Sequence, residues 1–227
     1  MHKCSKIITM QINSISIDST NSITELCLLG VKYPTDKSPY NNDDNLHKHA
    51  YTSIYNLLFS NIRYNNLHIG EIGILDNHSM LCWREFFPNA KLYGFEWFDS
   101  RLDKAIRDNI PNCTYTKMNV TDPKSIEKGL SDAGSNFDIL MDDSTHVFED
   151  QIKFINVAYK HLKPGGFLIV EDIFIDANEE DYSKAINHLS DYFSSATFIF
   201  ANHDLKHSPG WNNDKLLVLH RNNKLCS

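Results

Sequence analysis

From residue 67 onward, short apolar runs alternate with segments whose apolar residues recur at helical spacing. The segment 147–163, for example, carries Ile152, Ile155 and Leu162 on one helical face. The apolar runs cover residues 67–74, 91–97, 113–120, 137–143, 165–173, 196–204 and 215–221. Repeated strand–helix–strand units of this kind predict a mainly parallel sheet with helices on both faces.

The last two apolar runs are joined by LKHSPGWNN, residues 205–213, which is poor in helix-forming residues. A connection without a crossover helix favours an antiparallel pair at one edge of the sheet. The predicted fold class is therefore α/β, with a Rossmann-like, seven-stranded, mostly parallel sheet whose last strand is antiparallel.

Residues 1–66 lack this alternation. They contain an apolar stretch at 23–31 and a segment at 49–62 with apolar residues at helical spacing. We expect an N-terminal extension with a short helical cap over residues 1–66, and a single α/β domain over residues 67–227.

Charge and cysteine content narrow the functional classes. The 22 basic and 29 acidic residues give a net charge of −7, which disfavours nucleic-acid binding. No apolar run approaches the roughly 20 residues of a membrane span, and the N-terminus does not have the pattern of a signal peptide. Five scattered cysteines without a CxxC pair suit a reducing compartment and offer no zinc site. We expect a cytoplasmic protein that contacts neither nucleic acid nor membrane.

Polar residues end the leading strands, where open parallel sheets bind ligands. Glu71 and Gly73 end the first strand and Glu96 ends the second. The glycine allows a nucleoside to approach the backbone, and the acid at Glu96 can accept hydrogen bonds from both ribose hydroxyls. EIGILDNHS has one glycine where a dinucleotide fold needs three, so S-adenosylmethionine fits better than NAD or FAD. Ser79 is a further candidate for cofactor binding.

Two neighbouring strands end in paired acids, Asp142-Asp143 and Glu171-Asp172. Adjacent strands lie about 5 Å apart, so Asp143, Glu171 and Asp172 are expected to converge. Converging carboxylates need protons or a cation, and oxygen ligands favour Mg²⁺, Mn²⁺ or Ca²⁺ over zinc. Consecutive strand residues face opposite sides, so Glu171 and Asp172 can both be ligands only if the strand ends between them. The alternative is that these acids are separate caps and loop groups.

His146 follows the paired acids in the turn before a helix. An imidazole beside a metal is suited to take a proton from a hydroxyl, which makes His146 and Asp143 the candidate catalytic residues. The alternative for His146 is a surface histidine near a helix N-terminus. Asp142 is expected to orient the strand end and to lie near the cofactor.

With these residues in place, the chain resembles class I S-adenosylmethionine-dependent methyltransferases. More narrowly, it resembles the macrocin and mycinamicin type of sugar O-methyltransferase, which is metal-dependent and methylates deoxysugar hydroxyls. The resemblance covers about residues 33–175. Four segments carry it: TDKSPYNNDDNLHKHAYTSIY, EIGILDNHSMLCWREFFPNAKLYGFE, FDILMDDSTH and HLKPGGFLIVEDI.

The resemblance implies metal ligands at Asp143, Glu171 and Asp172, a catalytic base at His146 and a ribose-binding acid at Glu96. It also implies a cofactor-binding role for residues 67–227, with S-adenosylmethionine and Mg²⁺ or Mn²⁺ as cofactors.

Other positions are less typical of the family. Asn119 stands where the family has an acid near the adenine, and Ser144 replaces a glycine in DDSTH. ILDNHS replaces a glycine-rich cofactor loop. Lys37 and Tyr51, in the first similar segment, are expected to close over the cofactor or the acceptor.

The expected function is metal-dependent O-methylation of a sugar or a glycosylated small molecule, in natural-product or surface-polysaccharide biosynthesis. The expected partner is a small-molecule or glycan-precursor acceptor, and a homo-oligomer is one possible assembly. The alternatives are methylation of a catechol-like or a phosphorylated or nucleotide-linked small molecule, and a non-catalytic assembly partner.

Overall fold

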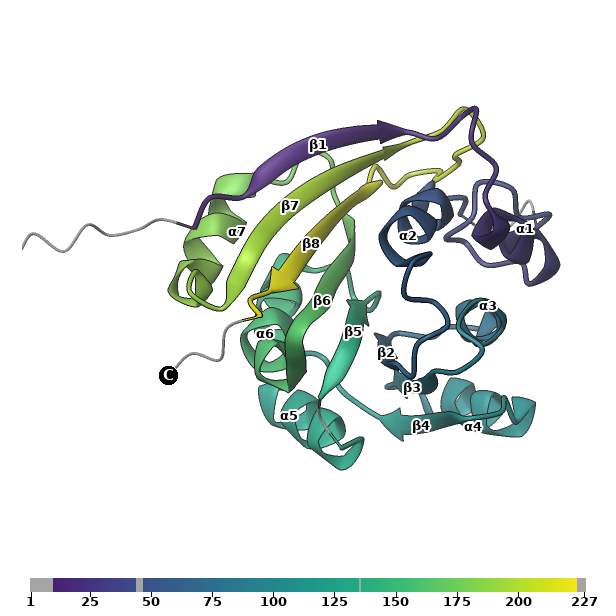
Figure 1. Ribbon diagram of the computed structural model, residues 1–227, viewed down its shortest axis with the longest axis horizontal. Coiled ribbons are helices and arrows are strands. Elements are labelled where there is room, and N and C mark those ends of the chain that lie inside the picture. Colours follow the sequence, from purple (N-terminus) through teal and green to yellow (C-terminus); the bar gives the residue numbers. More distant parts are fainter. Residues whose placement is uncertain (1–9, 44–46, 135, 224–227) are drawn as a thin grey trace, which may run out of the picture.

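The computed structural model describes residues 10–43, 47–134 and 136–223, and within them eight strands form one sheet (Figure 1). The order across the sheet is β1-β7-β8-β6-β5-β2-β3-β4. The strands are β1 (Asn13–Asp18), β2 (His68–Ile72), β3 (Lys91–Glu96), β4 (Cys113–Lys117), β5 (Phe137–Asp142), β6 (Leu162–Ile173), β7 (Phe193–Asn202) and β8 (Lys215–Arg221). The α-helices are α1 (Glu25–Lys32), α2 (Tyr51–Phe59), α3 (His78–Phe86), α4 (Asp99–Asp108), α5 (Pro123–Asp132), α6 (Phe148–Ala158) and α7 (Glu179–Ile186).

The strand directions confirm the predicted fold class. Strands β2 to β6 pair in parallel, and β8 runs antiparallel to both β6 and β7. The β7–β8 pair does not form the edge of the sheet, however, because β1 pairs in parallel with β7 outside it. The described residues therefore form an eighth strand that the sequence did not predict. Its sequence, NSISID, is polar and mostly exposed, so its hydrophobic signal is weak.

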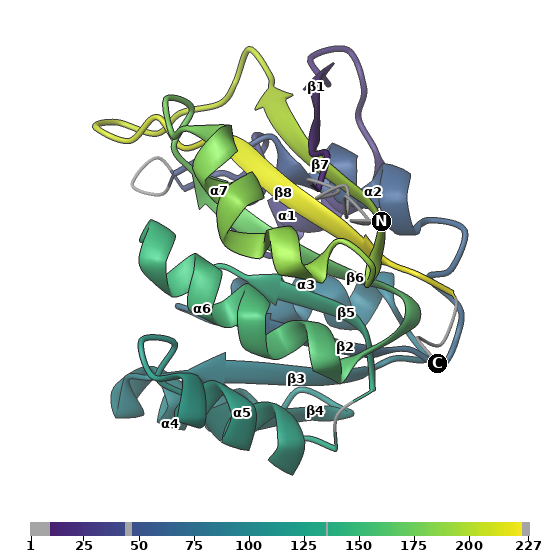
Figure 2. The same cartoon turned by 90° about the vertical axis from the view of Figure 1, so that its left-hand side faces the viewer.

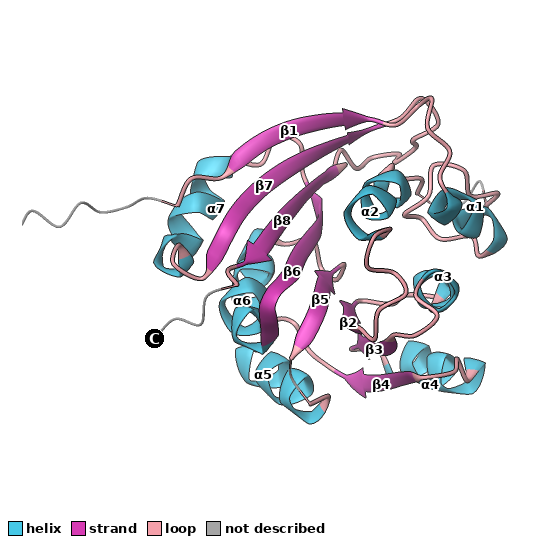
Figure 3. Ribbon diagram, in the orientation of Figure 1, coloured by secondary structure: helices cyan, strands magenta, loops and turns pink. Residues whose placement is uncertain are grey.

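Helices cover both faces of the sheet, as the alternating pattern predicts (Figures 1 and 3). On one face, α1, α2 and α3 share a core that includes Tyr51, Tyr55 and Trp83. On the other face, α5, α6 and α7 contribute Ile126, Phe154 and other buried residues to a second core. Figure 2 shows α5, α6 and α7 side by side on this second face.

The N-terminal segment covers the carboxyl ends of the central strands. The predicted helix at 49–62 is present as α2, and the apolar stretch at 23–31 forms α1. Helix α2 begins without a side-chain cap. Instead, the backbone N–H groups of Tyr51 and Thr52 donate to the carbonyl oxygen of Lys37. This contact fixes the backbone at Lys37 against the start of α2.

A bulge in β6 brings two consecutive acids to the same side. The pairing of β6 with β8 shifts register between Val170 and Ile173, and Asp172 has a φ of 56°. As a result, Glu171 and Asp172 both face α2. Strand β6 continues through both acids, so a bulge, and not a strand end, turns Asp172 to the side of Glu171. That both acids are metal ligands stays a prediction.

Among the described residues, no helix combines the length and the apolar content that crossing a membrane requires. The described cysteines Cys27, Cys82 and Cys113 are free thiols. Cys4 and Cys226 lie outside the described residues.

Candidate active site

A cavity opens at the carboxyl ends of β2, β3, β4 and β5. Its volume is about 380 Å³, within the roughly 300–1,000 Å³ of small-molecule sites. Five residues predicted for the site line it: Gly73, Glu96, Asn119, Asp143 and His146. Their strand-end positions explain the grouping, because parallel strands present their carboxyl ends at one edge of the sheet.

Gly73 allows two strand ends to approach closely. Its φ is 84°, and a Cβ atom there would lie 2.1 Å from the carbonyl oxygen of Asp143. Its N–H donates to the oxygen of Phe95, and the N–H of Asp143 donates to the oxygen of Ile72. The glycine is therefore required for the packing of the cavity floor itself, whatever the ligand.

Glu96 and Asn119 are both held by local hydrogen bonds. Oε1 of Glu96 accepts from the N–H groups of Trp97 and Phe98, at 2.8 and 2.9 Å. Oδ1 of Asn119 accepts from the N–H of Thr121 at 3.1 Å. Trp97 and Phe98 are half-exposed and line the cavity beside these groups, so their rings offer flat apolar surfaces for a base.

Two other predicted cofactor residues lie away from this cavity. Ser79 lines a smaller cavity that adjoins it at Gly73 and Asp143. Asp142 is buried, and burial raises the pKa of its carboxyl to about 7. Its Oδ1 accepts from the hydroxyl of Ser144, which does line the main cavity. Asp142 thus supports the turn that carries Asp143.

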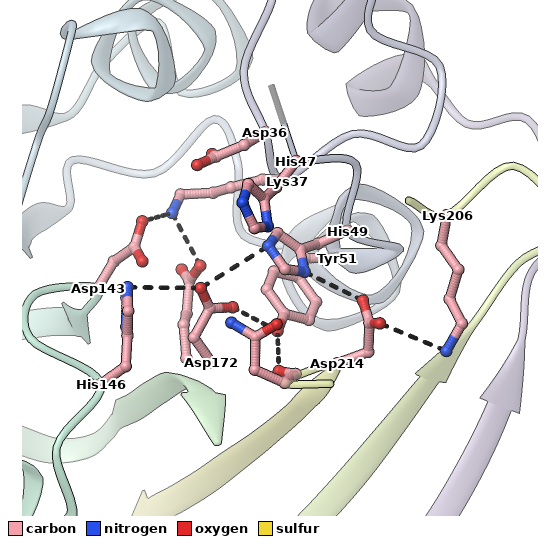
Figure 4. A network of polar contacts seen from close by, with 12 residues as sticks. Asp36, Lys37, His47, His49, Tyr51, Asp143, His146, Asp172, Lys206 and Asp214 are labelled. Atoms are coloured by element: carbon pink, nitrogen blue, oxygen red, sulfur yellow. Dashed lines mark hydrogen bonds and ion pairs between the residues drawn. The ribbon is translucent and has the colours of Figure 1, made fainter. Parts of the chain in front are cut away.

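The buried ammonium of Lys37 lies among three carboxylates, and Figure 4 shows its contact with one of them, Asp143. Nζ of Lys37 forms an ion pair with Asp143 and lies 2.8 Å from Oε2 of Glu171 and 3.3 Å from Oε1 of Glu71. Burial disfavours the charged amine, but the carboxylates outweigh it and hold the pKa of Lys37 well above its ordinary value. Glu71 also accepts a hydrogen bond from Nε1 of Trp83, so it belongs to this cluster and not to the cavity wall.

Asp143, His146 and Asp172 form a second group, in which one ligand atom from each lies within 4.8 Å of the others. Nε2 of His146 lies 3.6 Å from Oδ2 of Asp172, and the hydroxyl of Tyr51 donates to Oδ1 of Asp172 at 2.7 Å. The two carboxylates supply the oxygen donors that Mg²⁺ or Mn²⁺ prefers, and the imidazole lies beside them. Glu171, the third predicted ligand, lies outside this group and instead contacts Lys37 and Tyr55.

His146 is held in the turn after β5 with a φ of 58°. Burial lowers the pKa of this imidazole below its ordinary value, and the nearby Asp172 opposes that shift only in part. The neutral form, which can accept a proton, is therefore favoured. The ring of His146 meets the half-exposed ring of Trp211 edge to face at 6.3 Å, and Trp211 stacks on Phe174.

No protein-family model matches the chain, but individual proteins do. It is 26% identical over 163 residues to L-olivosyl-oleandolide 3-O-methyltransferase of Streptomyces antibioticus, covering 69% of this chain and 39% of the relative. It is also 26% identical over 133 residues to demethylmacrocin O-methyltransferase of Streptomyces fradiae, covering 56% of this chain and 32% of the relative.

The structure is similar to that of MycE, a methyltransferase of the mycinamycin biosynthetic pathway, solved in complex with Mg, SAH and mycinamycin VI. The TM-score is 0.65 at 17% identity, over 91% of this chain and 57% of that chain. The chain has the class I methyltransferase fold. The resemblance to the macrocin and mycinamicin type of sugar O-methyltransferase is confirmed. The chain spans only about a third to two fifths of the length of these sequence relatives.

Within this methyltransferase fold, a histidine and an aspartate extend the site behind Asp172. Nδ1 of His49 lies 3.0 Å from Oδ1 of Asp214, and its Nε2 lies 3.7 Å from Oδ2 of Asp172 (Figure 4). Burial lowers the pKa of His49, but the two aspartates outweigh burial and raise it to about 9. A positive imidazole therefore faces Asp172 from the side of α2.

The sequence did not predict the roles of Asp214 and Tyr55. Asp214 immediately precedes β8, and Tyr55 lies in the segment 49–62, for which the sequence predicted only an apolar helix face. An acid just before a strand in the antiparallel part of the sheet would have been a usable signal for Asp214. The contact of Tyr55 with Glu171 spans 116 residues, and no local pattern reveals it.

Proposed function

We propose that this chain is an S-adenosylmethionine- and divalent-metal-dependent O-methyltransferase acting on a hydroxyl of a sugar or a glycosylated small molecule. The observation that carries the proposal is the grouping of Asp143, His146 and Asp172, of which Asp143 and His146 line a cavity at the ligand-binding edge of a class I methyltransferase fold. The names of the relatives, which include L-olivosyl and rhamnosyl acceptors, support a sugar hydroxyl.

Asp143 and Asp172 would hold the divalent ion, with Glu171 as a further candidate ligand. When bound, the ion supplies positive charge that lowers the pKa of a neighbouring hydroxyl. His146 accepts the proton of that hydroxyl, since its imidazole is neutral by preference and is packed against Trp211. Tyr51 orients Asp172 by its hydrogen bond and is a positioning residue.

The cavity would accommodate S-adenosylmethionine, which supplies an activated methyl group. Glu96, Asn119 and the rings of Trp97 and Phe98 would bind its nucleoside end. Gly73 lines both this cavity and the smaller one that Ser79 lines, so these two residues would be candidates for binding the methionine part. Three predicted cofactor residues do not line the cavity and would only position the residues that do: Lys37, Glu71 and Asp142.

Further expectations belong to the same proposal. Residues 1–66 would serve as an extension and cap, and residues 67–227 as the cofactor-binding domain; the reach of Lys37 and Tyr51 over the strand ends supports the first part. The acceptor would be a natural-product glycoside or a surface-polysaccharide precursor. The net charge of −7 supports a partner other than nucleic acid. Methylation would take place in the cytoplasm, in a monomer or a homo-oligomer.

The test is a product screen with labelled S-adenosylmethionine and Mg²⁺. The acceptors are deoxysugar glycosides and nucleotide sugars, with a catechol, phosphorylated small molecules and the free aglycones as comparison. The proposal expects the label in the sugar part of at least one glycoside or nucleotide sugar. Transfer only to the catechol or to a phosphorylated non-sugar would contradict it.

We expect Trp211 to bind the acceptor. Its ring is 45% exposed, is backed by Phe174 and lies against His146, so an acceptor at His146 would pack on it. Trp211→Ala should raise the KM for the acceptor about tenfold and leave the affinity for S-adenosylmethionine unchanged. Trp97→Ala is the matched control at the other end of the cavity, and it should weaken S-adenosylmethionine instead. An unchanged acceptor KM in Trp211→Ala would exclude this role.

A further inference from the structure

The buried ammonium of Lys37 takes a position among carboxylates that a metal ion could also take. Its side chain is only 2% exposed, and its Nζ contacts oxygen atoms of Asp143, Glu171 and Glu71. These three carboxylates come from the ends of β5, β6 and β2, which meet at the centre of the sheet edge. Without a cation between them, these three carboxylates, two of them buried, would repel one another strongly.

Two of these carboxylates are also candidates for the divalent ion. Asp143 belongs both to the Lys37 cluster and to the group with His146 and Asp172. Glu171, an expected ligand, is engaged by Lys37 and by the hydroxyl of Tyr55. Because a divalent ion and an ammonium repel each other at short range, both cannot remain on the same carboxylates.

The backbone of Lys37 is held in place at the start of α2. The carbonyl of Lys37 accepts hydrogen bonds from Tyr51 and Thr52 at the start of α2, both at 3.1 Å. The four-carbon stem of lysine is flexible, whereas Glu71 is fixed by Trp83. Glu71 is neither in the Asp143–His146–Asp172 group nor, unlike Glu171, an expected metal ligand, so it can keep the ammonium when Asp143 and Glu171 are taken.

We propose that Lys37 is a resident counter-ion that holds Asp143 and Glu171 in the metal-free protein, and that a divalent ion binds by displacing its ammonium from these carboxylates toward Glu71. This inference rests on one part of the proposed function, the binding of a divalent ion, and does not require methyl transfer. Two consequences follow. Lys37 stabilises the metal-free fold, and it lowers the affinity for the ion because the ion must first displace it.

The test compares Mn²⁺ binding to the full chain and to Lys37→Met, which keeps most of the stem and removes the charge. Calorimetry should show that Lys37→Met binds Mn²⁺ about tenfold or more tightly than the unmodified chain, because the competing positive charge is gone. In the presence of a chelator, Lys37→Met should have a lower Tm than the unmodified chain. Addition of Mn²⁺ should raise the Tm of the variant by more than it raises that of the unmodified chain. Lys215→Met removes another buried lysine, whose Nζ donates to the carbonyls of Ile175 and Ala177, and should leave Mn²⁺ affinity unchanged.

A second variant keeps the proposal testable if Lys37→Met does not fold. Glu71→Gln removes the acceptor for the displaced ammonium, so it should weaken Mn²⁺ binding. Unchanged or weaker binding by folded Lys37→Met, or unchanged binding by Glu71→Gln, would overturn the inference.

The outcomes also separate this inference from the proposed function. Binding by Lys37→Met but not by the unmodified chain would support the counter-ion role and contradict the metal dependence of the proposed enzyme. Absence of Mn²⁺ binding in both proteins would overturn both.

Discussion

Asp143→Asn should lower methyl-transfer turnover by about a thousandfold while changing the affinity for S-adenosylmethionine by less than about threefold. Asp143 is the carboxylate shared by the Lys37 cluster and by the group with His146 and Asp172. Its loss removes a ligand of the divalent ion and leaves Lys37 with one partner fewer. Metal charge stabilisation is worth several kcal/mol, and about 4 kcal/mol corresponds to a factor of a thousand in rate.

The measurement is turnover at saturating S-adenosylmethionine, with Mg²⁺ titrated into chelator-treated protein. Asp132→Asn is the control: Asp132 pairs with Lys128 at the end of α5, and its loss should leave turnover unchanged. Turnover of Asp143→Asn near that of the unmodified chain, or turnover that survives the chelator, would show that this group is not the metal site.

His146→Gln should lower turnover by a factor of about 10²–10⁴, the usual contribution of a positioned general base. The affinities for S-adenosylmethionine and Mn²⁺ should stay within about threefold of those of the unmodified chain. Both affinities and the turnover must be measured, because His146 also lies within ligand distance of Asp143 and Asp172.

The pattern of these three values separates two roles for His146. Lost turnover with intact Mn²⁺ affinity indicates a base, whereas a parallel loss of Mn²⁺ affinity would identify His146 as a metal ligand and contradict its role as base. His188→Gln, on an exposed turn after α7, should change none of the values.

The positions of seven strands along the chain and the position of the cavity could be predicted, because they depend on local periodicity and on a general rule. Parallel strands present their carboxyl ends at one edge, so Gly73, Glu96 and Asn119 were correctly expected to lie near one another. Strand β1 was missed because its two isoleucines alternate with serines over only a few residues. Its pairing with β7 depends on residues about 180 positions away.

The direction in which the acidic side chains point from their strands was predicted less well. Glu71 alternates with Gly70 and Ile72 along β2 and faces Trp83 and Lys37, away from the cavity. Asp142 likewise points away from the cavity that Asp143 lines. The two acids, Glu71 and Asp142, face opposite sides of the sheet, because Asp142 pairs with Ile72. Alternation along the strands therefore separates the two side chains but does not show which of them meets the cavity. At Asp172 the same rule fails, because the bulge in β6 reverses it and no local residue pattern announces the bulge.

The central contact of the site could not be predicted from spacing at all. Lys37 and Asp143 are 106 positions apart and come from a loop before α2 and from the end of β5. Their meeting depends on how α2 packs over the strand ends. An expectation that Lys37 closes over the cofactor placed it at the right edge of the sheet, but its ammonium points into the acids.

Calorimetric titration with S-adenosylmethionine tests the central claim most directly, because every proposed role presumes that this cavity binds it. The unmodified chain should bind one equivalent, and Glu96→Ala should weaken binding about tenfold through loss of ribose hydrogen bonds. No binding by the unmodified chain, or binding that Glu96→Ala leaves unchanged, would contradict the assignment of this cavity to S-adenosylmethionine.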